Sequence, residues 1–138
     1  MKQLLLTLTF IALLSSCAFK SVTRSKEINY LQPSATLPQK SLNVFAPKKA
    51  EKAPVLVFIH GGSWNSGHKE IYDFMGSRLA RRGVVTVIID YPLAPEYKLP
   101  AMEKASTTAI KWVKDNISNY GGDPVSYTHL TLPTNREV

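Results

Sequence analysis

The sequence predicts an α/β fold in which strands and helices alternate and most strands pair in parallel. Two runs of apolar, mostly β-branched residues, 55–59 and 84–89, are typical of strands that are buried on both faces of a sheet. Each run is followed by a segment whose apolar residues recur at helical spacing, over 69–82 and 101–117. This order of strand, helix, strand and helix predicts a sheet with helices packed on its faces.

Residues that interrupt regular structure lie where these elements should begin and end. A short edge strand is expected over 42–45, before the first buried strand. Gly83 follows the first predicted helix, at the position where a helix often ends on a residue with positive φ. Pro100 is well placed for the start of the second helix, and a break is expected over 121–124.

Composition and charge fit one globular domain and do not favour a nucleic-acid-binding protein. The chain has 138 residues, of which 44% are hydrophobic and 20% charged, and its formal net charge is +7. The cations are scattered, and the densest group, Lys48, Lys49 and Lys52, falls in a predicted surface turn. No basic stripe alternates with aromatic residues, so we expect a solvated basic surface and no nucleic-acid partner.

The first residues have the pattern of a secretory signal peptide. Lys2 precedes an apolar run over 4–14, which is too short for the roughly 20 residues that span a bilayer. The run ends in Leu14-Ser15-Ser16-Cys17, which resembles the lipobox of bacterial lipoproteins. The resemblance implies that residues 1–16 are a lipoprotein signal peptide and that Cys17 carries the lipid. An ordinary cleaved signal with a coincidental cysteine is the alternative.

This interpretation also predicts where the protein is found. A lipid-anchored protein of this type lies in the bacterial cell envelope, facing the periplasm or the cell exterior, and its membrane partner is the bilayer that takes the Cys17 lipid. Residues 17–40 are then expected to form the lipidated cysteine and a polar tether, because this segment is rich in serine, threonine and proline.

A glycine motif follows the first buried strand and indicates chemistry. The strand leads directly into His60-Gly61-Gly62-Ser63-Trp64. Two glycines in this place allow a tight turn and a close approach of the backbone to a ligand. Backbone N–H groups that converge on one point stabilise an anion, as acyl transfer requires of an oxyanion hole. Removing one such donor costs about 2.7–4 kcal/mol.

The motif and three later segments resemble one family of enzymes. The His-Gly-Gly-x-Trp form resembles the oxyanion loop of the α/β-hydrolase superfamily, in its esterase branches related to feruloyl esterases and hormone-sensitive lipase. Residues 90–96, 99–101 and 120–124 resemble segments of these enzymes in the same order. The resemblance implies that residues 41–124 are a partial α/β-hydrolase domain, the N-terminal portion of the fold, truncated before the nucleophile elbow.

The resemblance also assigns roles within the loop. It implies that the backbone N–H groups of Gly62 and Ser63 form the oxyanion hole, while Gly61 and His60 shape the loop. Trp64 is expected to pack the loop, with a place in the wall of the substrate pocket as the alternative. No metal and no cofactor is expected.

The three catalytic side chains of a serine hydrolase are not found in this sequence. In this fold they follow the order serine, acid, histidine, which excludes His60, Asp90 and Asp123 from the triad because all three precede the nucleophile. The nucleophile should lie in a Gly-x-Ser-x-Gly turn, and no such motif occurs here. We therefore expect that this chain alone is inactive.

Residues 125–138 lack an apolar run and glycine, unlike the nucleophile strand of the family. This segment can be back-translated into a DNA sequence that resembles the mosaic end and adaptor of transposon-based sequencing libraries. We expect a non-native tail that takes no part in the fold, in which His129 has no catalytic meaning. A divergent but genuine segment is the alternative.

Three functions remain open at this point. The first is a serine hydrolase of the carboxylesterase type, acting on small-molecule or polysaccharide-linked esters. The second is an acyl-peptidase on the same fold, and the third is a catalytically dead lipoprotein that binds a ligand or partner. A Gly-x-Ser-x-Gly turn after residue 124 favours the first two, and its loss favours the third.

Overall fold

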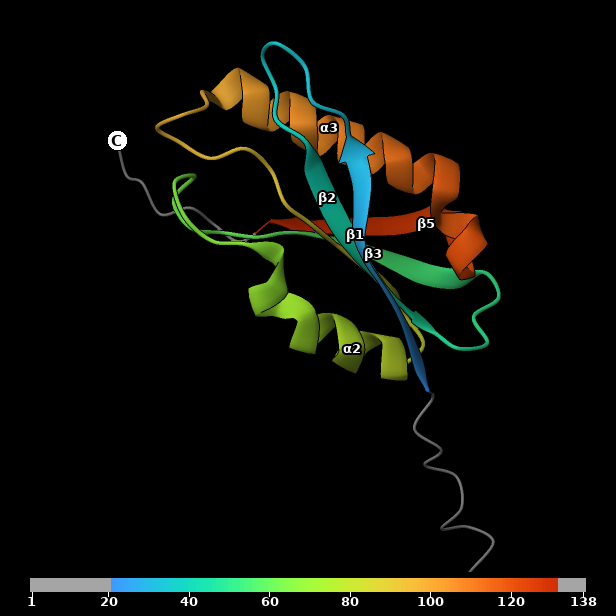
Figure 1. Cartoon of the computed structure of the whole chain (residues 1–138). Helices are drawn as coiled ribbons and strands as arrows, with labels where there is room; N and C mark the ends of the chain where they lie inside the picture. Colours follow the sequence, from blue (N-terminus) through green and yellow to red (C-terminus); the bar gives the residue numbers. More distant parts are fainter. Residues whose placement is uncertain (1–20, 132–138) are drawn as a thin grey trace, which may run out of the picture.

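A five-stranded sheet forms the centre of the structure, a computed structural model that describes residues 21–131 (Figure 1). The spatial order of its strands is β1-β2-β4-β3-β5. The strands are β1 (Val22–Leu31), β2 (Lys40–Pro47), β3 (Ala53–Ile59), β4 (Val85–Ile89) and β5 (Gly122–Thr131).

The sheet is mixed, with its parallel part in the half that carries the glycine motif. β3 pairs in parallel with both β4 and β5, whereas β2 is antiparallel to β4 and to β1. Because Ile59 lies beside Ile89 and Leu42 also pairs with Ile89, the ends of β3 and β4 and the start of β2 share one edge of the sheet. We call the side of the sheet where β3 and β4 end the carboxyl edge, and the opposite side, where β3 and β4 begin, the amino edge. Both terms refer to strand ends and not to the outermost strands.

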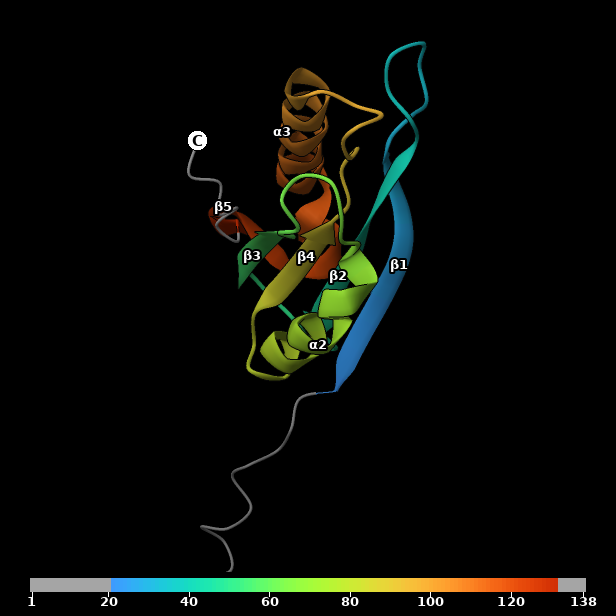
Figure 2. The same cartoon turned by 90° about the vertical axis from the view of Figure 1, so that its left-hand side faces the viewer.

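One helix covers each face of the sheet, as Figures 1 and 2 show. The long helix α3 (Leu99–Asn116) packs on one face, and α2 (Asp73–Arg81) packs on the other. All five residues of β4 are buried, because side chains of alternating residues point into the two cores. The predicted α/β class is confirmed, and within residues 21–131 no helix is both long and apolar enough to cross a membrane.

The two predicted helices are confirmed with small shifts at their ends. α3 has a proline in its first turn, as expected from Pro100. The segment over 69–82 begins instead as a short 3-10 helix, Lys69–Tyr72, before α2. Gly83 follows α2 with φ of 96°, as expected for a residue after a helix end.

The expectation of a tether over 17–40 is wrong for the residues that form β1. Val22–Leu31 pairs with β2 as the edge strand of the sheet. Most of its side chains stay in solvent, and only Tyr30 and Leu31 are buried, so the hydrophobic pattern of a strand is missing from the sequence. A bulge near Glu27, whose φ is 54°, interrupts the alternation further. Residues 1–20, with the predicted signal and Cys17, lie outside the described residues.

The expectation that residues 125–138 take no part in the fold is wrong as far as residue 131. β5 pairs in parallel with β3, but the register between the two strands is irregular. Ala53 pairs with Gly122, whereas Val55, two residues further along β3, pairs with Tyr127, five residues further along β5. This irregular register leaves Val125 exposed. Sheet pairing uses backbone groups, so an extended segment can occupy the free edge of β3 without an apolar pattern. The adaptor origin of this segment stays a prediction, and residues 132–138 lie outside the described residues.

We predict that Gly76→Ala destabilises the fold, although alanine is the better helix former by about 1 kcal/mol. A β-carbon on Gly76 of α2 would overlap the ring of Phe45, which is completely buried in β2. Overpacking of this kind costs about 1–3 kcal/mol. Urea unfolding should show the loss, whereas the exposed α3 substitution Thr107→Ala should leave stability within about 0.5 kcal/mol. Equal stability of Gly76→Ala and the parent would contradict this packing.

Candidate active site

The loop that follows β3 at the carboxyl edge has an unusual backbone. Gly62, Ser63 and Trp64 have φ values of 131°, 52° and 64°. Only glycine adopts the first without strain, and a β-carbon on Gly62 would overlap the carbonyl oxygen of Ser66. Two consecutive non-glycine residues with positive φ are uncommon and cost energy, which the contacts around the loop must offset.

Hydrogen bonds to one carbonyl group close the turn. The Gly62 oxygen accepts the backbone N–H groups of Asn65 and Ser66, each at 3.1 Å, and the Ser66 hydroxyl at 2.9 Å. Among residues 21–131, no acceptor is found for the backbone N–H of Gly62 or Ser63. Gly62 is half-buried and Ser63 is exposed, so the two residues lie at the surface of the loop. The geometry supports the oxyanion assignment of these two residues, which stays a prediction.

His60 connects the loop to the end of β3. Its side chain is buried, with Nδ1 2.9 Å from the Gly61 carbonyl oxygen and Nε2 3.4 Å from Oδ1 of Asp90. The ring also stacks on Tyr91 at a centroid distance of 4.6 Å. A β-carbon on Gly67 would lie 2.8 Å from Nδ1, so the loop folds closely over the imidazole. These contacts support the predicted loop-shaping role of His60 and Gly61.

An ion cluster around the buried Lys69 lies on the other side of His60. Asp90, at the end of β4, accepts the Lys69 backbone N–H at 2.8 Å and the Lys69 ammonium at 3.0 Å. The same ammonium lies 2.9 Å from Glu27 and 2.6 Å from Glu70. Lys69 is only 3% exposed, which is possible for a lysine because three carboxylates surround its charge.

The ionisation of these groups follows from the cluster. Burial alone would raise the pKa of Asp90, but the His60 ring, whose Nε2 lies 3.4 Å away, and hydrogen bonds from both donors of Lys69 lower this pKa from 3.8 to about 2. Burial would lower the pKa of Lys69, but hydrogen bonds to Glu70, Glu27 and Asp90 raise it above its usual value. Both groups are therefore charged at neutral pH, and Asp90 is held as a structural anion.

Aromatic residues hold the loop from the side of the chain that follows β4. The Tyr91 hydroxyl donates to the His60 carbonyl oxygen at 2.8 Å, and its ring meets Trp64 edge-on at 5.8 Å. The Ala94 N–H donates to the Trp64 carbonyl oxygen at 2.8 Å. The half-buried Trp64 packs against the core, in line with the packing role, and its alternative place in the pocket wall stays a prediction.

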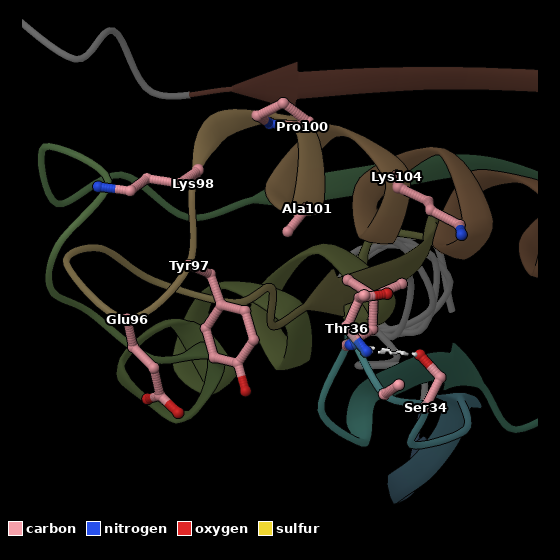
Figure 3. Close-up of a pocket in the computed structure, with 10 residues that line it drawn as sticks. Ser34, Thr36, Glu96, Tyr97, Lys98, Pro100, Ala101 and Lys104 are labelled. Atoms are coloured by element: carbon pink, nitrogen blue, oxygen red, sulfur yellow. Dashed lines mark hydrogen bonds between the residues drawn. The ribbon is translucent and has the colours of Figure 1, made fainter.

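A hollow of about 580 Å³ opens at the same carboxyl edge, between the loop that joins β1 to β2 and the start of α3 (Figure 3). Its lining is mixed, with hydroxyl, carboxylate and ammonium groups among apolar surfaces such as those of Leu37, Pro100 and Ala101. Residues on the two sides include Ser34, Thr36, Glu96, Tyr97, Lys98 and Lys104. The hydrogen bond between Trp64 and Ala94 connects the glycine loop to the segment that follows β4. This segment continues into residues 96–98, which line the hollow.

Sequence reasoning missed most of the supporting residues. Lys69 was only the first residue of a predicted helix, and Glu27 lay in the predicted tether. The sequence signal was limited to Asp90 at the end of a buried strand, a common place for a functional carboxylate. Its lysine partner is 21 positions away and could be found only from the fold. His68 is a surface residue, with its side chain 61% exposed.

Comparison with known proteins finds a family match and many related esterases. Residues 42–128 match the BD-FAE family. The chain is 38% identical over 89 residues to esterase LipC of Mycobacterium tuberculosis, covering 62% of this chain and 22% of that protein. It is 31% identical over 125 residues to isoprenylcysteine alpha-carbonyl methylesterase ICME of Arabidopsis thaliana, covering 87% of this chain and 29% of that protein.

Solved structures give the same result for the fold. An esterase of Pyrobaculum calidifontis has a TM-score of 0.66 and 28% identity, with 89% of this chain and 38% of that chain covered. Esterase B of Lactobacillus rhamnosis has a TM-score of 0.72 over 94% of this chain and 43% of the other, at 22% identity. This chain therefore spans between about a fifth and under a half of the proteins that it matches.

We predict that Asp90→Asn lowers the stability of the chain at pH 7 by about 2 kcal/mol, the free energy that corresponds to its lowered pKa. Because the folded pKa lies below 3.8, this stabilisation is complete above about pH 4 and is lost as the pH falls toward 2. Urea unfolding between pH 7 and pH 2.5 should show a smaller acid loss in Asp90→Asn than in the parent.

The matched control is Asp115→Asn, which changes an exposed carboxylate on α3 whose one ion pair within residues 21–131 is with Lys111. It should retain the parental pH dependence, because exposed pairs contribute little. An identical acid loss in Asp90→Asn and the parent would contradict the structural role of this anion.

Proposed function

The chain belongs to the BD-FAE family of α/β-hydrolases, and from this we propose that the whole protein is a serine hydrolase that cleaves carboxylic esters. The observation that carries the proposal is the pair of backbone donors at Gly62 and Ser63, which have no acceptor within residues 21–131 and are held at the carboxyl edge by the buried His60 and the ion cluster around Lys69. The relatives named as esterases support the same reaction class.

The residues of this chain would act on the carbonyl oxygen of the ester. When a serine hydroxyl attacks the carbonyl carbon, the C=O π bond breaks and its electron pair moves to oxygen, while a base takes the hydroxyl proton. The N–H groups of Gly62 and Ser63 would donate to this oxygen, and they act mainly where the charge develops, in the transition state. Collapse of the intermediate restores the carbonyl and breaks the bond to the alcohol oxygen, which takes the proton back from the base. Water then attacks the acyl-serine in the same way, which releases the acid and restores the serine hydroxyl. The serine, acid and base would come from a part of the protein outside this sequence.

We propose small-molecule or polysaccharide-linked esters as the substrate class. The hollow at the same carboxyl edge carries hydroxyl, carboxylate and ammonium groups, which can donate hydrogen bonds to, and accept them from, a hydroxylated or sugar-bearing portion of the ester. The methylesterase and carboxylesterase names among the relatives favour esters over peptides for the scissile bond. No cofactor is needed for this chemistry.

We also propose that the protein is anchored in the bacterial cell envelope by a lipid on Cys17. The support is the sequence alone: a short apolar run, then Leu14-Ser15-Ser16 before the single cysteine of the chain. An enzyme in this place would meet esters outside the cytoplasm, which agrees with a polysaccharide-linked substrate.

In a full-length form that carries the nucleophile, Gly62→Pro should lower kcat about 100-fold or more with a smaller change in KM. Proline removes one oxyanion donor and cannot adopt the φ of 131° that Gly62 has. The matched control is Ser63→Gly, which keeps the N–H and relieves the positive φ of 52°, so it should keep near-parental kcat.

Hydrolysis of p-nitrophenyl acetate by both variants and the parent gives these values, and thermal melts separate a lost donor from lost folding. A folded Gly62→Pro enzyme with parental kcat would show that the loop is a structural turn.

Cys17→Ala should release the protein from the membrane of a bacterial host, since alanine has no sulfur to take the lipid. Fractionation into membrane and soluble parts, with immunodetection, measures the release. Ser25→Ala, an alanine substitution in β1 away from the lipobox, is the control and should stay with the membrane. If Cys17→Ala and the parent divide equally between the two fractions, the lipid anchor is excluded.

A further inference from the structure

The amino edge of the sheet carries a dense group of exposed cations, which we call the basic end. Three of its members lie in the turn between β2 and β3, and two close α2 just before β4. The basic end consists of Lys48, Lys49, Lys52, Arg81 and Arg82, all of them exposed. None of the five forms an ion pair within residues 21–131, and Glu51 is the only acid in their turn.

The start of the described chain lies against this basic end. The Lys48 N–H donates to the carbonyl oxygen of Ser21 at 2.8 Å, and Val22 pairs with Pro47 at the end of β2. Figures 1 and 2 show the start of β1 beside the end of α2, at the same end of the molecule. Cys17 is four positions before Ser21, so even a fully extended chain would keep the two within roughly 14 Å.

We propose that the basic end docks on the anionic phospholipid headgroups of the membrane that holds the protein. The proposal rests on the proposed anchor at Cys17 for its setting, because that anchor would hold the five cations close to the bilayer. Unpaired lysine and arginine side chains near an anionic surface are each attracted by about 1 kcal/mol, within a Debye length of about 8–10 Å. The short connection from Cys17 to Ser21, and the five cations that form no ion pair within residues 21–131, are the two reasons for proposing this end of the domain as the docking surface.

Docking by the basic end determines which way the active site faces. The glycine loop follows the last residue of β3, whereas the basic end precedes its first residue. The seven residues of β3 separate the two ends by roughly 20 Å. The oxyanion loop and the hollow would therefore face the aqueous side, toward dissolved or polysaccharide-linked esters and away from lipids of the anchoring bilayer.

Flotation with lipid vesicles tests the proposal on the full chain. Every protein carries Cys17→Ser so that no lipid is attached, and binding is compared between phosphatidylcholine vesicles and vesicles that also contain 30% phosphatidylglycerol. The apolar leader is common to all variants, so the ratio of binding to the two vesicle types reports the effect of charge. We expect this ratio to exceed ten at low ionic strength and to fall toward one in 0.5 M salt.

Paired substitutions locate the effect on the surface. Lys48→Gln/Lys49→Gln and Arg81→Gln/Arg82→Gln should each lower the ratio on the order of tenfold, because two surface charges are lost. Lys98→Gln/Lys104→Gln is the matched control, since it removes two exposed cations from the carboxyl edge. It should leave the ratio within about twofold.

A ratio near one for the parent would overturn the proposal, as would an equal loss in the control pair, which would mean that net charge alone drives binding. Equal competition by a soluble polyanion such as polyphosphate at the same charge concentration would also overturn it, in favour of an acidic polymer as the partner. Because no arm of the experiment carries the Cys17 lipid, its outcome is independent of the fractionation test of the anchor and of the esterase test.

Discussion

The buried contact between Lys69 and Asp90 is the interaction on which the candidate site depends. It joins the first turn after the glycine loop to the end of β4, and so closes the segment between β3 and α2 over the carboxyl edge. Burial of these charges is costly, and the cost is offset only because Glu27 and Glu70 complete the surroundings of the ammonium. Glu27 reaches the site from the bulge of β1, so even the edge strand contributes to the position of the loop.

His60 links the ion cluster around Lys69 and Asp90 to the glycine loop. With one ring nitrogen beside the Gly61 carbonyl and the other beside Asp90, the imidazole fixes the point from which the backbone turns through Gly62 and Ser63. Tyr91 holds the same residue through its hydroxyl and its ring. Donors held in this way need little rearrangement when a negative charge develops, and such preorganisation is the main source of oxyanion stabilisation. The positive φ values of Ser63 and Trp64 lie in the loop that carries the proposed oxyanion donors, and backbone strain of this kind is typical of functional sites.

The sequence predicted those parts of the fold that a local apolar pattern or a local conformational preference identifies. Buried strands such as 84–89 have an apolar run, and Gly83 and Pro100 mark helix ends by their local conformational preferences. β1 was missed because its side chains are mostly in solvent, and β5 because its pairing with β3 relies on backbone groups. The glycine loop was predictable from its motif, whereas the ion cluster unites Glu27, Lys69 and Asp90 from three distant segments, and no local pattern reveals it.

The central claim is that the backbone N–H groups of Gly62 and Ser63 bind the oxyanion of an ester under attack. A crystal structure of a full-length form with a phosphonate covalently bound to its nucleophilic serine tests this claim most directly, because the phosphoryl oxygen takes the place of the oxyanion. We expect this oxygen within about 2.7–3.1 Å of both backbone nitrogens, with the His60–Asp90 contact unchanged. A phosphoryl oxygen that is bound by other donors, with Gly62 and Ser63 turned away from it, would contradict the account.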